Sequence, residues 1–510
     1  MSNSKKTLKK NKKFIQNSGA FVDLKNNYIY FLATIRSFFK NKNFLKHFGF
    51  IYGLYFIGIF GLLIADVYHG DDIWRMQQGN PDYFFASRHL SQILSYFFHA
   101  SYPKIADISP LSQLIAIAFL SIGSMVLVKV VNNKITYLGL TASLLLGLNP
   151  WYLQCIAYKF DSIFMALATL CAIFPFLFKK RASLFFIVSV FLLVCMWNLY
   201  QANNGIYIVT AFFIIVNLIV LKMDLKQILK FLFLSALAFI VSALIYKIFF
   251  FIEPKTGSYI GKKIGTIGAG SIIPNIKELF ITINSNLGNH TIKYLFLLTI
   301  PFFILSMFQR RKTNCLITTI SVFVFLSVGL VISYGAYLGL SKFDQDPRAI
   351  AQIGGFLAII AIVTVSIKHR IITILSKCIV SYMAYALITI SNSYANALDM
   401  QVQFISYRIN LMISDLEHLL PVDPKENVSL RIKSIYIPEP FRSAYSNVLP
   451  LFSKHTSLVS VQNVNRSRHR GINTVIKDCR DKDDKPIKIF ETRFHKIQVF
   501  ENNCYEVSYK

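Results

Sequence analysis

The feature that most constrains this chain is a series of apolar segments, each about as long as a bilayer core is thick. Residues 182–221 show it most clearly, because these 40 consecutive positions contain no charged side chain and the polar stretch 198–205 divides them in two. A helix needs about 20 residues to cross a core of roughly 30 Å. The segments of this kind are 47–65, 111–130, 135–149, 162–178, 182–198, 206–221, 228–250, 291–308, 313–334, 350–367 and 371–391. They predict an α-helical polytopic membrane protein with about 11 transmembrane helices.

Composition agrees with a membrane protein. Hydrophobic residues make up 54% of the chain and charged residues only 15%, where a soluble domain has roughly 25% charge. This balance excludes a disordered chain, a coiled coil, collagen and a small disulfide-rich secreted scaffold. The formal net charge of +29 would suggest nucleic-acid binding in a soluble protein. Here the cations mostly flank apolar segments, so we expect them to contact the lipid bilayer, and we expect no nucleic-acid partner.

The distribution of basic residues predicts the topology. Residues 1–46 contain eleven Lys and Arg and one acidic residue, and 28–39 could form an amphipathic helix at the interface. Five further basic loops alternate with loops that hold acidic, Asn, Gly and Pro residues. These basic loops contain Lys129 and Lys134, residues 179–181, Lys222, Lys226 and Lys230, residues 310–312, and residues 368–370. The positive-inside rule therefore places the N-terminus in the cytoplasm, and an odd number of spans places the C-terminus outside.

The chain divides into three parts. A basic cytoplasmic segment, 1–46, precedes a transmembrane domain, 47–392, whose first outer loop is 66–110. Hydropathy then falls, and residues 393–510 predict a small outer α+β domain with a helix over 393–420 and strands in 428–437 and 486–500. Five of the seven cysteines lie in or beside apolar segments. The other two, Cys479 and Cys504, could form a disulfide if this domain faces an oxidising compartment.

The first outer loop has the densest group of ionisable residues, in 66–75. Asp71 and Asp72 are adjacent carboxylates at the edge of the hydrocarbon, where desolvation and mutual repulsion can raise a pKa. A carboxylate of this kind could be the general base that deprotonates a sugar hydroxyl. Arg75 follows one helical turn later and could help to hold a phosphate leaving group. The alternative is a solvated turn in which an Asp caps a helix.

Other outer segments add polar groups. Lys159 and Asp161 precede one apolar segment, and Gln201 and Asn203 lie at the tip of the hairpin within 182–221. Amide groups of this kind can bind sugar hydroxyls, but a polar turn and a capped helix explain them equally well. The apolar segments themselves are nearly free of ionisable residues, which proton-coupled transporters usually need. The cysteines show no zinc-site spacing, and we find no Walker motif.

Taken in order, several of these segments resemble the phage-type O-antigen glucosyltransferase family, the serotype-converting enzymes of the glucosyltransferase II type. The resemblance covers about residues 60–400, and residues 400–510 match less clearly. One departure is Ser87, because Gly would be expected before Arg88. The motifs that carry the resemblance are Asp71-Asp72-Ile73-Trp74-Arg75, Arg88-His89-Leu90, Asn149-Pro150-Trp151-Tyr152, Tyr158-Lys159-Phe160-Asp161-Ser162, Tyr200-Gln201-Ala202, Pro347-Arg348 and Tyr394-Ala395-Asn396-Ala397.

This resemblance implies a GT-C-like membrane glycosyltransferase in the bacterial inner membrane. Such an enzyme would transfer glucose from undecaprenyl-phosphate-glucose to the O-antigen of lipopolysaccharide on the periplasmic side. Its functional partners would be a polyprenyl-phosphate glucosyltransferase and a small flippase, and no cofactor or metal is indicated. We expect either Asp72 or Asp71 to be the base, with Asp72 slightly favoured for its spacing from Arg75. The expected donor-binding and phosphate-binding residues are Arg75, Arg88, Lys159 and Arg348, and the expected sugar-binding residues are Asp161, Gln201 and Asn203.

Three other functions fit parts of the pattern. A related GT-C transferase could carry mannose, arabinose or an amino sugar instead of glucose. A lipid-linked sugar flippase is disfavoured, because the polar groups gather on one side of the membrane rather than along a path. An O-antigen polymerase is disfavoured because the order of the motifs does not suggest its large late periplasmic loop.

The topology can be tested with reporter fusions at the C-terminus. We expect a C-terminal alkaline phosphatase fusion to be active and a green fluorescent protein fusion to be dark, because five basic loops place the intervening loops and the C-terminal domain outside. A fluorescent fusion together with an inactive phosphatase would reverse the topology and would exclude a periplasmic mechanism.

Overall fold

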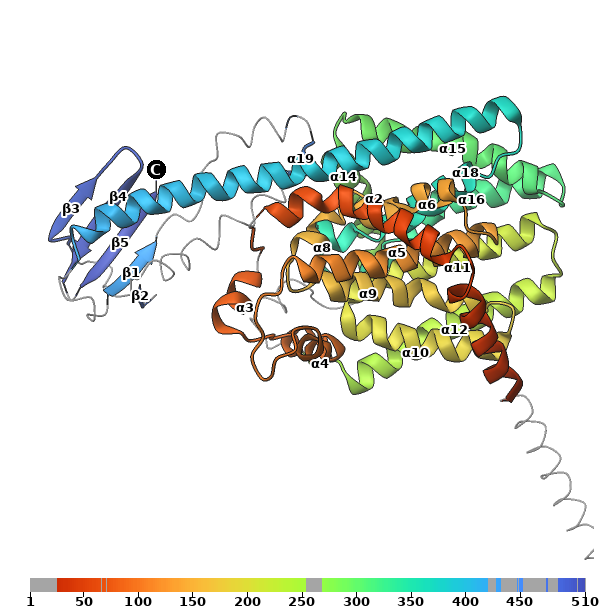
Figure 1. Cartoon of the computed structure of the whole chain (residues 1–510), viewed down its shortest axis with the longest axis horizontal. Helices are drawn as coiled ribbons and strands as arrows, with labels where there is room; N and C mark the ends of the chain where they lie inside the picture. The colour runs from red at the N-terminus through yellow and green to blue at the C-terminus, as the bar shows by residue number, and fades with distance from the viewer. Residues whose placement is uncertain are drawn as a thin grey trace, which may run out of the picture.

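The protein is a helical bundle from which one long helix extends to a small sheet (Figure 1). The computed structural model describes residues 25–509 apart from 66, 70, 254–267, 421–427, 433–446, 448, 453–473, 476–484 and 502. Within these residues, eight helices are long and apolar enough to cross a membrane. They are α2 (Phe44–Ile64), α5 (Leu111–Asn132), α10 (Ala182–Leu199), α11 (Asn204–Val220) together with the preceding 3₁₀ turn from Gln201, α12 (Leu225–Phe249), α15 (Thr291–Arg310), α16 (Cys315–Ile332) and α19 (Arg370–Glu417).

The other three predicted spans are shorter helices. Residues 135–149 form α6 (Tyr137–Ser143) and α7 (Leu145–Leu148), 162–178 form α9 (Ser162–Ile173) and the 3₁₀ helix η2 (Phe174–Phe178), and 350–367 form α18 (Ile353–Thr364). Nearly every side chain of α9 and α18 is buried by neighbouring helices. Helices enclosed in this way face protein rather than lipid, so their length need not match the bilayer. The prediction of a helical membrane protein is confirmed, and eight of the eleven expected spans have the length to cross a membrane.

The helix α19 crosses the predicted boundary between residues 392 and 393 without a break. It has 48 residues and is therefore about 70 Å long. Neither Gly nor Pro occurs between Arg370 and Glu417, so nothing in the sequence interrupts the helix. Its first half packs against α2, where the Asn392 amide donates to the carbonyl of Ile57 and accepts from the Gly61 N–H. Its second half carries the C-terminal sheet (Figure 1).

The C-terminal part contains a sheet in which β1, β3 and β4 fall in the two predicted strand regions, whereas β2 and β5 lie outside them. Its strands are β1 (Val428–Ile432), β2 (Thr474–Val475), β3 (Lys488–Glu491), β4 (His495–Phe500) and β5 (Cys504–Tyr509), in the order β2-β1-β5-β4-β3. Arg408 of α19 donates to the carbonyl of Phe494 at 2.6 Å, and the Tyr505 hydroxyl donates to the carbonyl of Leu419 at 2.9 Å. Cys504 is disulfide-bonded. Its predicted partner, Cys479, lies outside the described residues, so this pairing stays a prediction.

The N-terminal helix and the outer loops lie at opposite ends of the bundle (Figure 1). Residues 25–39 are helical, and Phe31 of this helix stacks on Phe178 while Tyr28 is 63% exposed. The other end is built from short elements of the predicted site segments. These are α3 (Asp72–Gln78), η1 (Phe84–Ala86), α4 (His89–Phe98), α8 (Leu153–Ala157), η3 (Gln201–Asn203), η5 (Gly335–Gly339) and α17 (Pro347–Ile350). Nearby outer residues form η4 (Ala269–Ser271) and α14 (Ile272–Leu287).

Candidate active site

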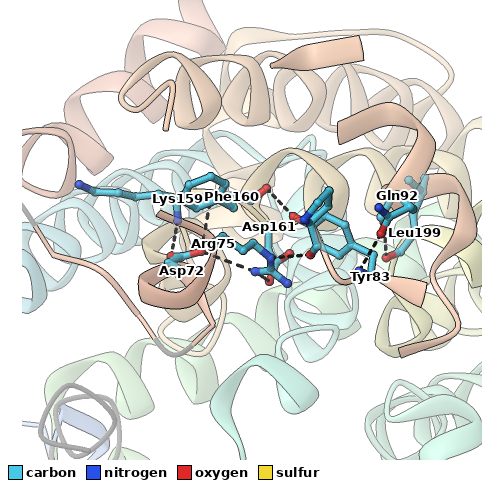
Figure 2. Close-up of polar contacts among 10 residues, drawn as sticks. Asp72, Arg75, Tyr83, Gln92, Lys159, Phe160, Asp161 and Leu199 are labelled. Atoms are coloured by element: carbon cyan, nitrogen blue, oxygen red, sulfur yellow. Dashed lines mark hydrogen bonds and ion pairs between the residues drawn. The ribbon is translucent and has the colours of Figure 1, made fainter. Parts of the chain in front are cut away.

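A buried carboxylate ties the first outer loop to the start of α9 (Figure 2). Asp72, the first residue of α3, is fully buried. Its Oδ2 accepts the backbone N–H of Lys159 at 2.8 Å, and its Oδ1 accepts that of Phe160 at 3.2 Å. Both oxygens are therefore used within the protein, so this carboxylate positions the backbone of 159–160.

Arg75 completes a buried ion cluster with two carboxylates. Its Nη1 lies 3.2 Å from Asp161 Oδ2 and 3.8 Å from Asp72 Oδ1, and its Nε donates to the carbonyl of Pro81 at 2.9 Å. The guanidinium also lies over the ring of Tyr83, with Cζ 4.4 Å from the centroid. Asp161 occupies the N-cap position of α9, yet its side chain makes no capping hydrogen bond and binds Arg75 instead.

Burial and charge act on the two carboxylates in opposite directions. Burial, together with the charge of Asp161, raises the pKa of Asp72 to about 8, although Arg75 and the two N–H groups oppose this. Burial also disfavours the ionised form of Asp161. Arg75 and two further guanidiniums outweigh that effect, so the pKa of Asp161 is lowered. Asp161 is thus the carboxylate of this pair that holds its negative charge most firmly.

Asp71 differs from the adjacent Asp72 in its exposure to solvent and in its hydrogen bonding. It precedes α3, its side chain is exposed, and it makes no capping hydrogen bond. Within the described part of the chain, no group donates a hydrogen bond to its carboxylate. Its charge favours the ionised form of Arg348, so the two side chains share one environment. An accessible carboxylate without an internal partner is what a general base requires.

Two guanidiniums face the same region from different loops. The Arg348 Cζ lies 4.7 Å from the centroid of the Tyr158 ring, and its Nε lies 3.8 Å from Asp346 Oδ2. Arg88 lies over the ring of Tyr200, with Cζ 4.8 Å from the centroid. The hydroxyl of that same Tyr200 donates to the carbonyl of Arg348 at 3.3 Å, which links the two loops.

Within the described part of the chain, the hydrogen bonds and ion pairs of both arginines leave their terminal nitrogens unused. The Arg88 Nε donates to Gln201 Oε1 at 3.1 Å, and the Gln201 amide donates in turn to the carbonyl of Ala86. Among the residues that the structure describes, no acceptor binds the Nη atoms of Arg88 or Arg348. Two guanidiniums with free Nη groups are suited to bind a phosphate.

Three of the predicted site residues have other surroundings than expected. The Lys159 ammonium lies 3.9 Å from the centroid of the Tyr68 ring and points away from Asp161 (Figure 2), so this residue contributes its N–H to the ion cluster. Asn203 is buried and donates to the Met165 carbonyl at 2.7 Å, which fixes η3 to α9. Gln201 orients Arg88. The structure therefore brings together Asp71, Asp72, Arg75, Arg88, Asp161, Gln201 and Arg348 at one end of the bundle.

Sequence reasoning missed an aromatic group around these charges. The His69 ring stacks on Tyr158 with 5.1 Å between centroids, and its Nε2 lies 3.1 Å from the Tyr394 hydroxyl of α19. Burial and the charge of Arg348 lower the pKa of His69 to about 3, so the ring is neutral. Tyr158 and Tyr394 belong to two of the resembled motifs, which is the signal that could have identified them. In the described part of the chain, no group of His, Cys, Asp and Glu side chains is placed to bind a metal ion.

The family model described as "Glucosyl transferase GtrII" matches residues 59–365. The chain belongs to this family. The matched region contains Asp71, Asp72, Arg88 and Arg348, whereas α19 and the C-terminal sheet lie beyond it. The resemblance to the glucosyltransferase II type is thus confirmed, and the glucosyl transferase GtrII family makes this protein a membrane glycosyltransferase. Neither a curated protein nor a solved structure matches the chain.

The geometry predicts that Asp72 supports the structure of the site. In Asp72→Asn, one carboxylate oxygen becomes an NH₂ group that must face the N–H of Lys159 or Phe160. We expect the free energy of unfolding to fall by about 1–3 kcal/mol, because a buried donor loses its acceptor. The measurement is thermal unfolding of the detergent-solubilised protein. Asp71→Asn is the matched control, and equal midpoints for the two variants would contradict the role given to Asp72.

Proposed function

We propose that this protein transfers glucose from undecaprenyl-phosphate-glucose to the O-antigen of lipopolysaccharide on the periplasmic side of the inner membrane, as phage-type serotype conversion requires. The observation that supports this most is an exposed carboxylate, Asp71, in the same region as two guanidiniums whose Nη atoms have no acceptor among the described residues. This combination suits transfer from a sugar phosphate to a hydroxyl.

In the proposed reaction, the Asp71 carboxylate and the two guanidiniums have separate roles. Asp71 takes the proton of the acceptor hydroxyl while that oxygen forms a bond to the anomeric carbon of glucose. The bond between the anomeric carbon and the phosphate oxygen breaks, and polyprenyl phosphate leaves. The phosphate changes from a diester with one negative charge to a monoester with up to two. Arg88 and Arg348 stabilise this added charge, which is a reason for two guanidiniums at the site.

The buried cluster of Asp72, Arg75 and Asp161 holds these groups in place. Asp72 fixes the start of α3, and Asp71 is the residue immediately before it. Tyr158, which contacts Arg348, is the residue immediately before the backbone that Asp72 binds. One carboxylate therefore controls the relative positions of the base and of the phosphate-binding arginine. This division of roles assigns the base to Asp71 and a positioning role to Asp72.

The position of the site supports the periplasmic side. The turns between η2 and α10, between α15 and α16, and between α18 and α19 lie at the end of the bundle opposite to α3 and α4 (Figure 1), and they contain the basic loops 179–181, 310–312 and 368–370. Basic loops normally stay in the cytoplasm, so the end with the site would face the periplasm. The polar groups gather at this end instead of following a path between the helices, which favours a transferase over a flippase. Another sugar in the donor remains the main alternative, and the assay below compares donors.

The chemistry predicts a large effect at Asp71. Asp71→Asn should lower the rate of glucose transfer by about 10²–10⁴-fold, because the general base is lost while the exposed site tolerates the amide. The assay is transfer of labelled glucose from undecaprenyl-phosphate-glucose to O-antigen in membranes, with the mannose-bearing donor in parallel. Asp82→Asn, which changes another exposed carboxylate of the same loop, should be normal. A normal rate in Asp71→Asn would exclude this residue as the base.

The two arginines should affect use of the donor. Arg88→Gln or Arg348→Gln should lower kcat/KM for the donor by roughly 10- to 150-fold, because a charge-assisted hydrogen bond contributes about 1.5–3 kcal/mol. Lys104→Gln removes an exposed cation of the same outer loop and is the control. Variants with an unchanged kcat/KM for the donor would show that the phosphate binds elsewhere.

A further inference from the structure

The helix α4 is amphipathic in the opposite sense to a helix on a water-soluble protein. Its fully buried side chains are polar: Ser91, Gln92 and Ser95. Its most exposed side chains are apolar, since Ile93 is 61% exposed and Phe97 73% exposed. The helix therefore turns its polar face to the protein and an apolar face outward.

Hydrogen bonds explain why the polar face is turned inward. The Ser91 hydroxyl donates to the carbonyl of Leu199 at the end of α10, at 3.1 Å. Gln92 Oε1 accepts the N–H of Tyr83 at 2.9 Å, and its amide donates to the Tyr96 hydroxyl at 2.8 Å. Because the bonds to Leu199 and Tyr83 reach other elements and fix the rotation of the helix, Ile93 and Phe97 face outward. An apolar face held in this direction is stable against lipid and costly against water.

The helix lies across the outer end of the bundle. Figure 1 shows α4 end-on, whereas α10 and α12 run across the picture, so the axis of α4 runs across the direction of these candidate spans. The neighbouring η1 adds Phe84 and Phe85, which are 46% and 73% exposed, and α12 ends with Phe249, which is 73% exposed. We call Phe84, Phe85, Ile93, Phe97 and Phe249 the outer apolar surface.

Hydrogen bonds join the parts of this surface. The His89 Nε2 lies 2.7 Å from the carbonyl of Phe250, and the Ile252 N–H donates to the Ser87 hydroxyl at 3.0 Å. The hydroxyl of Tyr246 in α12 donates to the carbonyl of Ser87 at 3.1 Å. Residues 87–89 thus attach the start of α4 to the end of the span α12. The surface therefore adjoins the end of a helix that is long and apolar enough to cross a membrane.

The same three residues border the charged part of the site. Arg88 lies between Ser87 and His89, and its side chain contacts Gln201 and the ring of Tyr200. The Nη atoms of Arg88, which have no acceptor among the described residues, and the outer apolar surface therefore adjoin the same short stretch of backbone. A ligand with a phosphate at Arg88 and a long apolar chain would find both binding partners here.

We propose that the outer apolar surface binds the isoprenoid chain of the donor where it leaves the phosphate at Arg88. This inference rests on the proposed function, because it needs a polyprenyl-phosphate donor. The occupant is the donor chain rather than bilayer lipid in general, because the surface adjoins the proposed phosphate-binding arginine and the chain is covalently attached to that phosphate. The first isoprene units would then lie beside Phe84 and Phe85, next to Arg88, and the following units would contact Ile93 and Phe97 of α4.

The test compares two donors of different chain length in detergent micelles. Ile93→Ser and Phe97→Ser should each raise KM for undecaprenyl-phosphate-glucose by about 3- to 10-fold, because part of an apolar contact is lost. KM for a geranyl-phosphate-glucose donor, whose chain is too short to extend along α4, should not change, and kcat should be constant for both donors. Phe97→Leu, which keeps an apolar side chain, should restore most of the affinity for the long donor.

The control is Phe323→Ser on α16, because Phe323 is 70% exposed on a different span. It should leave KM unchanged for both donors. An unchanged KM for the long donor in Ile93→Ser and Phe97→Ser would overturn the inference and would leave the surface in contact with bilayer lipid only. An equal rise in KM for both donors would overturn it as well, since the site itself would be distorted. A wild-type protein that uses neither donor would overturn the proposed function and this inference with it. This result differs from the two outcomes above, in which the wild-type protein is active and only the variants decide.

Discussion

The site depends on one buried ion cluster in which Arg75 lies between two carboxylates. Asp72, Arg75 and Asp161 are all nearly inaccessible to water, so each would be costly to bury alone. The cluster is stable because every member has partners: two backbone N–H groups for Asp72, the Pro81 carbonyl for Arg75 and a guanidinium for Asp161. It joins the first outer loop to the start of α9, two segments that are more than 80 residues apart in the chain.

The cluster places the two consecutive aspartates, Asp71 and Asp72, in different environments. At the start of α3, successive side chains point in different directions, so Asp72 is buried while Asp71 is exposed. The buried carboxylate has no oxygen left for a substrate, and the exposed one has no partner among the described residues. The site thus combines a buried, hydrogen-bonded interior with an accessible carboxylate, the proposed base, and the guanidiniums of Arg88 and Arg348 lie at its edge.

The surroundings of the site suit the proposed reaction between a lipid-linked donor and a sugar acceptor. In this proposal the outer apolar surface binds the lipid chain beside Arg88, whereas the exposed Asp71 meets the acceptor hydroxyl. The helix α19 adds a direct connection to the C-terminal sheet, because its Tyr394 contacts His69 in the first outer loop and its Arg408 contacts Phe494 before β4. A single helix therefore reaches both the site and the sheet.

The sequence by itself determined the class of protein, the outer segments that build the site and the family. Hydrophobicity adds up along a segment and motif order is a property of the chain, so neither needs a structure. Only the tertiary structure decided that Asp71 is the exposed aspartate and that Lys159 contributes its N–H to the ion cluster instead of its ammonium. It also decided that Asn203 faces α9 and that α4 turns its apolar face outward. These outcomes depend on the direction of each side chain, which is fixed by contacts between segments distant in sequence and by nothing within the segment itself.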